Sequence, residues 1–186
     1  MFKRVLKNER GLTLIELLAV IVILGIIAAI AIPAIGGLID NSKKDAHVAN
    51  AQQMINAAKI AVTADKDLIP ANGKAKAISL KYLEDNGYLE TVKDPDKTQN
   101  GYIEAIPGTS QITADLDVSG SSIKDGSIDG EPGSGSYVII INDNNKLYYR
   151  VKLVNAQRGV QSQSQGQGQG SKAVAEDNLK RSEVRP

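Results

Sequence analysis

A long uncharged apolar run near the N-terminus is the strongest constraint on the fold of this 186-residue chain. Residues 17–39 contain no charged side chain and consist mainly of Leu, Ile, Val and Ala. About 20 such residues cross a bilayer as a helix. Lys and Arg cluster before the run, which predicts that the N-terminus stays in the cytoplasm and the remainder lies outside. We therefore expect a single-pass protein of the cytoplasmic membrane.

The segment before this run, residues 1–11, is short, polar and basic. It reads as a processing and orientation signal and not as part of the fold. Its removal would take the formal net charge from +1 to −2. A mildly acidic chain is a poor candidate for binding nucleic acid, which depends on neutralising phosphates. We therefore predict no direct nucleic-acid partner.

The helix is expected to run from Leu12 to about Thr63, with a transmembrane half over 12–39 and an amphipathic half over 40–63. In the second half, apolar side chains recur at steps of three and four residues, which indicates one buried face. Pro33 removes a helical hydrogen bond, so a bend or local melting is expected there. The members of the apolar stripe are Val48, Ala51, Ile55, Ala58 and Val62.

Residues 64–155 read as a small α+β head. Two β-branched or aromatic runs joined by a short Asn/Asp turn predict a hairpin, and a short helix over residues 78–86 precedes it. Together with weaker strand candidates, this predicts an antiparallel sheet of three to four strands. The expected elements are a loop at 64–77, a helix at 78–86 capped by Ser79 and stopped at Gly87, weak strands at 101–106 and 111–118, a loop at 119–136, and hairpin strands at 137–141 and 146–154.

The last segment, residues 156–186, contains a Gln/Ser/Gly repeat followed by a charged end. It offers few apolar side chains to bury, so its composition predicts disorder.

Little in the chain indicates catalysis, and we predict that it is not an enzyme and holds no cofactor or metal. There is no cysteine, and a zinc site cannot be built from one histidine alone. That histidine, His47, is expected on the solvated side of the helix. No nucleotide-binding GxxxxGK[ST] motif is present. An acidic stretch, whose spacing does not match an EF-hand, is expected to be a solvated loop; it consists of Asp115, Asp117, Asp125, Asp129 and Glu131.

The junction between the leader and the apolar run reads RGLTLIELL over residues 10–18. It resembles the prepilin cleavage site of type IV pilins and pseudopilins: a basic leader, a Gly, a Glu five residues on, and an apolar run with a mid-span Pro. Many members have Phe after the Gly, where this chain has Leu12. The absence of cysteine is typical of Gram-positive type IV pilins and of many pseudopilins.

The resemblance implies a fold and a processing pathway. A membrane protease, the prepilin peptidase, would cut after Gly11 and methylate the amine of Leu12. Glu16 would then lie one turn from a positive amine that can neutralise it, and with Pro33 it would set register during assembly. The implied fold is a pilin fold, in which the long helix packs on the small sheet. The implied partners are the membrane, other pilin subunits, an assembly platform protein and an ATPase.

The implied function is a structural subunit of a type IV pilus for adhesion or motility, exported to a cell-surface filament. Three alternatives remain open. One is a pseudopilin of type II secretion or of a competence DNA-uptake system. Another is a membrane-tethered binding protein that never polymerises. The third treats the apolar run as an ordinary secretory signal, with a cleavage site near Ala28, Ala29 and Ala31 and a mature start near Ala34.

Overall fold

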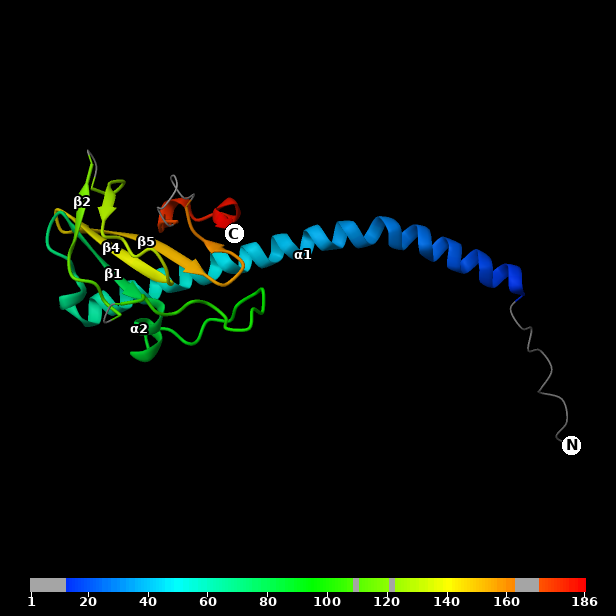
Figure 1. The fold of residues 1–186 in the computed structure, drawn as a ribbon, viewed down its shortest axis with the longest axis horizontal. Coiled ribbons are helices and arrows are strands. Elements are labelled where there is room, and N and C mark those ends of the chain that lie inside the picture. Colours follow the sequence, from blue (N-terminus) through cyan, green and yellow to red (C-terminus); the bar gives the residue numbers. More distant parts are fainter. Residues whose placement is uncertain (1–12, 109–110, 121–122, 163–170) are drawn as a thin grey trace, which may run out of the picture. The chain divides into compact units, whose positions relative to one another are not determined.

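The computed structural model describes residues 13–108, 111–120, 123–162 and 171–186 (Figure 1). It divides into two compact units, Met1–Asp40 and Asn41–Pro186, which are described separately. One helix, α1 (Leu14–Ala64), contributes residues to both. The predicted end of this helix, at about Thr63, is confirmed to within one residue, and its predicted start at Leu12 lies outside the described residues.

The first unit consists, among its described residues, of the apolar part of α1. Its large side chains, from Leu14 to Ile39, are all at least about half exposed. It holds the one stretch in the described chain that is long and apolar enough to cross a membrane. The helix continues through Pro33 without interruption, so the local melting expected there is not found. A proline removes a single backbone hydrogen bond, and the flanking turns keep theirs.

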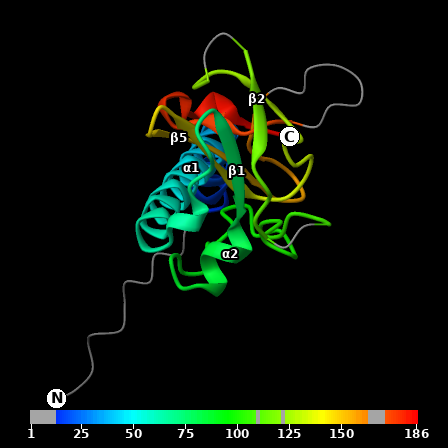
Figure 2. The same cartoon turned by 90° about the vertical axis from the view of Figure 1, so that its left-hand side faces the viewer.

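The second unit is an antiparallel sheet with α1 along one face (Figures 1 and 2). The strand order is β3-β2-β1-β4-β5-β6-β8, and β7 pairs with β5 beside β6. The sheet thus has eight described strands where the sequence predicted three to four. The strands are β1 (Lys74–Ser79), β2 (Leu116–Ser119), β3 (Ser127–Asp129), β4 (Tyr137–Asp143), β5 (Lys146–Val154), β6 (Gly159–Val160), β7 (Val174–Ala175) and β8 (Val184–Arg185). The short helices are η1 (Lys66–Leu68), α2 (Leu80–Asp85), η2 (Glu176–Asn178) and η3 (Arg181–Glu183).

The core between α1 and the sheet confirms the predicted apolar stripe. Ala51, Ile55, Ala58 and Val62 are buried, and Val48 packs against them. Alternate residues of β4 and β5 meet this helical face, because successive strand side chains point to opposite faces. The strand residues in the shared core are Val138, Ile140, Val151 and Leu153.

The other face of the sheet is buried too. It carries Tyr137, Ile139 and Ile141, and it is covered by side chains from the 106–128 region and from Ala173. Sheets buried on both faces carry continuous apolar runs, as β4 does. The second cluster therefore explains why β4 reads YVIII and does not alternate.

Two local predictions are confirmed in atomic detail. The Ser79 hydroxyl caps α2 by accepting a hydrogen bond from the amide of Tyr82 at 3.0 Å, and Gly87 follows with a φ of +73°. The β4–β5 turn consists of Asn144 and Asn145, both with positive φ, as a type I′ hairpin turn requires.

Other expectations are corrected. The predicted loop at 64–77 contains most of β1, and the loop at 119–136 contains β3. Residues 101–106 form only an isolated bridge at Tyr102, and the strand expected over 111–118 is reduced to a bridge at Ile112 and to β2. β1 was missed because two of its three apolar residues are small alanines, which carry a weak strand signal, although Ala75 to Ser79 pair with Ile141 to Tyr137 of β4.

The prediction that 156–186 is disordered is wrong for the described residues of that segment. β6, β7 and β8 extend the sheet beyond β5. Val160, Val174 and Val184 are buried in the core. Few apolar residues were needed, because a strand added to an existing sheet gains backbone hydrogen bonds as well as burial. The Gln/Gly-rich residues 163–170 lie outside the described residues.

Candidate functional site

The start of α1 carries the first candidate site, and its local chemistry is a capping box. The Glu16 carboxylate accepts a hydrogen bond from the Thr13 amide at 2.8 Å and another from the Thr13 hydroxyl at 2.7 Å. In return, the Glu16 amide lies 3.3 Å from the Thr13 hydroxyl oxygen. Thr13 and Glu16 therefore satisfy one another's polar groups at the point where the helix begins. Gly11 and Leu12 lie outside the described residues.

Glu16 is the single acidic residue in a surface of exposed apolar side chains. Leu14, Ile15 and Leu17 around it are all exposed. A carboxylate in such a surface is costly in lipid unless a partner satisfies it. Thr13 satisfies one of its oxygens and leaves the other without a partner among the described residues. The geometry thus leaves room for one further donor at this carboxylate.

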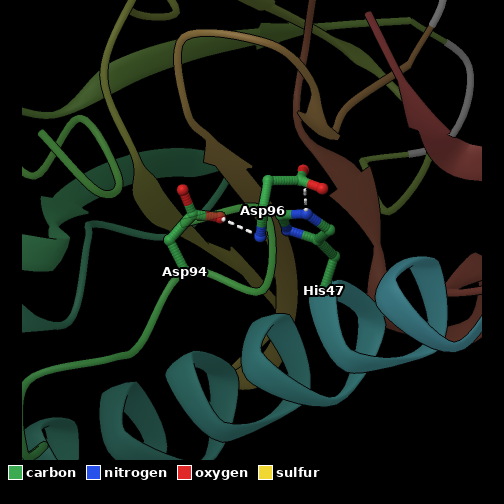
Figure 3. A group of neighbouring side chains, drawn as sticks. All are labelled: His47, Asp94 and Asp96. Atoms are coloured by element: carbon green, nitrogen blue, oxygen red, sulfur yellow. Dashed lines mark hydrogen bonds and ion pairs between the residues drawn. The ribbon is translucent and has the colours of Figure 1, made fainter. Parts of the chain in front are cut away.

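The second candidate site is a buried polar cluster around His47 (Figure 3). The expectation that His47 is solvated is wrong, because the residue is 0% exposed. Its Nε2 donates to Asp96 at 2.9 Å, and its Nδ1 accepts from the hydroxyl of Tyr102 at 2.8 Å. This assignment describes the neutral ring, in which one nitrogen donates and the other accepts. Asn50 donates in turn to the Tyr102 oxygen at 3.0 Å.

Asp96 is the centre of this cluster and is 2% exposed at its side chain. Arg158 makes a bidentate contact with it, from Nε at 2.8 Å and from a terminal nitrogen at 2.7 Å. Lys43 lies 3.6 Å from the same carboxylate. Hydrogen bonds from Arg158, aided by those from His47 and Asn155, hold the pKa of Asp96 well below its usual range despite burial. The carboxylate therefore ties α1 to the 94–102 loop and to the β5–β6 connection.

His47, Asp94 and Asp96 lie close enough together to suggest a metal site, since their ligand atoms are within 4.8 Å of one another. The carboxylate oxygens, however, are already in use. Those of Asp94 accept from the Asp96 amide, from Asn155 and twice from Thr98. Those of Asp96 face two cations, and a bound divalent ion would have to displace Arg158. The cluster is therefore organised as a network of ion pairs and hydrogen bonds and not as a cation site. We call the contacts of Asp96 with Lys43, His47 and Arg158 the Asp96 network.

The Asp96–His47–Tyr102 order resembles the acid–base–hydroxyl chain of a nucleophilic enzyme, but it lacks the access that catalysis needs. Tyr102 is buried, and burial raises the pKa of its hydroxyl far above the usual value. A nucleophile needs a lowered pKa or a base that faces substrate. The cluster holds the fold together, and nothing in its geometry activates the hydroxyl.

The predicted acidic loop does not converge on one point. Asp115 and Asp117 pair with Lys76 and Lys74, respectively, Asp129 contacts Ser119, and Glu131 accepts from the Ala173 amide. These four carboxylates lie on or next to β2 and β3, and each has its own protein partner.

The burial of His47 has a signal in the sequence. His47 lies four residues before Ala51 and seven before Met54, both of which are buried. That spacing puts all three on one helical face. The identity of its partner, 49 residues further along the chain, carries no local signal.

A comparison with protein families matches residues 6–32 to the prokaryotic N-terminal methylation motif. The match covers the leader junction, Thr13, Glu16 and most of the apolar run. The comparisons with curated proteins and with solved structures found no match. This chain carries the N-terminal signature of type IV pilins and pseudopilins, joined to an α+β head.

Proposed function

We propose that this chain is a structural subunit of a type IV pilus or pilus-like filament, assembled from the membrane through its N-terminal helix. The observation that carries the proposal is the methylation motif at residues 6–32. Prepilin peptidase would cut after Gly11, leaving Leu12 as a methylated N-terminus. The head would then stand outside the membrane and reach the cell surface in a filament.

The exposed apolar helix supports this proposal. Within the described chain, no other segment covers the large side chains of this helix between Leu14 and Ile39. Both a bilayer and a bundle of identical helices would remove that surface from water. A subunit stored in the membrane and transferred to a filament core exchanges one apolar environment for the other.

The capping box suggests how processing and assembly are coupled. In the precursor, Thr13 engages one oxygen of Glu16. Cleavage would create a positive amine at Leu12, adjacent to Thr13, and this amine or that of a neighbouring subunit would serve as the missing donor. Pro33 would contribute by making one point of the helix easier to extend during assembly.

Processing is tested by co-expressing the full chain with a prepilin peptidase and measuring intact mass. The expected product begins at Leu12 and carries one added methyl group. A product beginning near Ala34 would instead identify an ordinary secretory signal and contradict the proposal.

Assembly is tested with two variants at one position. Glu16→Gln preserves a capping box, since Gln fills the same position well, but it removes the charge. Glu16→Ala removes both. We expect both variants to insert and to be cleaved, and both to fail to form filaments in electron micrographs of sheared cells labelled with antibody to the head. Wild-type filament yield from Glu16→Gln would show that capping suffices and that the charge pairing is unnecessary. Correct processing of the wild type without filaments would instead favour a membrane-tethered protein.

A further inference from the structure

A buried lysine on β5 lacks the charge partner that such a group usually has. Lys152 is 2% exposed. Its ammonium donates to two neutral groups, the carbonyls of Gly133 at 2.8 Å and Ser171 at 2.7 Å. Its other neighbour is the ring of Tyr137, with the ammonium 5.8 Å from the ring centroid. No ion pair joins it to a carboxylate in the described chain. The adjoining residues 163–170 contain no acidic residue either.

Such an arrangement is costly, because a buried charge without a counter-charge loses its hydration without recovering Coulomb energy. Burial accordingly lowers the pKa of Lys152, with Glu131 opposing the effect. Glu131 itself is committed elsewhere, to the amide of Ala173 and the hydroxyl of Tyr137. Two of the three ammonium hydrogens are accounted for, which leaves one donor.

The lysine lines a hollow of about 220 Å³. Along one wall runs the loop 133–135, with the sequence Gly-Ser-Gly, whose backbone amides donate no hydrogen bond within the described chain. Arg158 and Gln161 are also at the wall. Gly135 has a φ of +90°, and a Cβ there would lie 2.3 Å from the carbonyl oxygen of Ala105, so only glycine fits. Free amides of small residues beside a cation are a common way to bind anions.

We propose that this hollow binds a small oxyanion, a carboxylate or phosphate group, through the Lys152 ammonium and the 133–135 amides. The hollow is large enough for such a group. Arg158 adds positive potential, and two of its hydrogen bonds go to Asp96. The ligand has two possible sources: a free anion and an acidic side chain of a second copy of this chain. The site is independent of whether the chain forms filaments.

The test uses the full chain in detergent micelles, with inorganic phosphate as the probe and ionic strength held constant with sodium chloride. All six tyrosines lie between residues 82 and 149, so tyrosine fluorescence reports unfolding of the head. Phosphate at about 100 times its dissociation constant should raise the midpoint of thermal unfolding by about 5–11 °C. The rise should saturate. Lys152→Met should abolish it, whereas Lys146→Met, the same change at an exposed position of β5, should leave it intact. An unsaturable rise, or an equal rise in Lys152→Met, would overturn the proposal.

A second pair of variants covers the case in which Lys152→Met does not fold. Ser134 is exposed and lines the hollow. Ser134→Asp supplies a carboxylate from the chain itself, and Ser134→Asn is its uncharged match. The Asp variant should unfold at a higher temperature than the Asn variant and should no longer respond to phosphate. Equal midpoints and equal phosphate responses would refute the site. If the phosphate effect does not depend on protein concentration, the ligand of the site is a free anion. If the protein self-associates and phosphate prevents this, the ligand is an acidic side chain of a second copy. Either result supports the site.

Discussion

Replacing Asp96 by Asn should destabilise the head strongly while leaving its shape nearly unchanged. The substitution removes the charge that Arg158 and His47 share, and the guanidinium, which is 16% exposed, loses the buried carboxylate that it contacts twice. Breaking one side of a buried ion pair costs about 3–5 kcal/mol. Asn retains one carbonyl acceptor, so the lower end, about 3 kcal/mol, is expected. For a chain of this size that corresponds to a fall of about 6–12 °C in the unfolding midpoint.

The measurement is thermal unfolding of the full chain in micelles, followed by tyrosine fluorescence. Asp177→Asn is the matched control. Asp177 also pairs with a cation, Lys124 at 2.6 Å, but its side chain is 68% exposed, and solvent-exposed pairs contribute little. The control should therefore unfold close to the wild type. If Asp96→Asn and Asp177→Asn unfold at the same temperature, the Asp96 network contributes no more to the stability of the head than a surface ion pair does. The reasoning from burial is then refuted.

The same carboxylate predicts a pH dependence. The pKa of Asp96 is depressed in the folded head, chiefly by hydrogen bonds from Arg158. An unfolded chain therefore takes up this proton first, so the contribution is complete above about pH 4 and is lost progressively as pH falls further. The difference in stability between the wild type and Asp96→Asn should shrink as pH is lowered from about 4 to about 2. A difference that stays constant over this range would contradict the assignment.

Two backbone predictions follow from positive φ angles. Gly135→Ala should destabilise the head by about 1–3 kcal/mol or more, because its φ of +90° disfavours a side chain and the added Cβ would meet the Ala105 carbonyl. Chemical denaturation measures this loss of stability. A variant as stable as the wild type would contradict the prediction. Asn145→Gly should be neutral or slightly stabilising and Asn145→Val destabilising by about 1–2 kcal/mol, because this position has a φ of +65° in the hairpin turn. Equal stability of the Gly and Val variants would show that the turn relaxes.

The features that could be predicted from the sequence are those set by short-range rules. A capping residue, a glycine stop and an Asn-Asn turn act within a few residues, and Ser79, Gly87 and Asn144 take the expected roles. The buried face of α1 repeats along one helix, so a period of three and four residues reveals it. The junction motif is equally local, and the methylation motif matched at residues 6–32 covers it.

The features that were missed depend on partners far apart in the chain. β1 has one large apolar residue, Ile78, and becomes a strand because β4 offers it five paired positions. The segment after residue 170 joins the sheet because β5 and β6 present free edges to it. His47 can be buried because Asp96 and Tyr102 form hydrogen bonds with its two ring nitrogens. Composition and periodicity describe a segment alone, so they underestimate any segment whose burial depends on such a partner.

The Asp96 network also has a mechanical consequence that follows from chain connectivity. The head begins at Asn41, directly after the apolar unit, so any pull along the N-terminal helix enters it there. Near the start of the head, Lys43 and His47 tie α1 to other segments through Asp96, and Asp45 does so through a bidentate contact with Arg181. The first two share a buried carboxylate, whereas the Asp45–Arg181 pair is exposed. A pull on the N-terminal helix would therefore reach the Asp96 network close to the point where it enters the head, and hydrogen bonds to a charged group resist separation strongly.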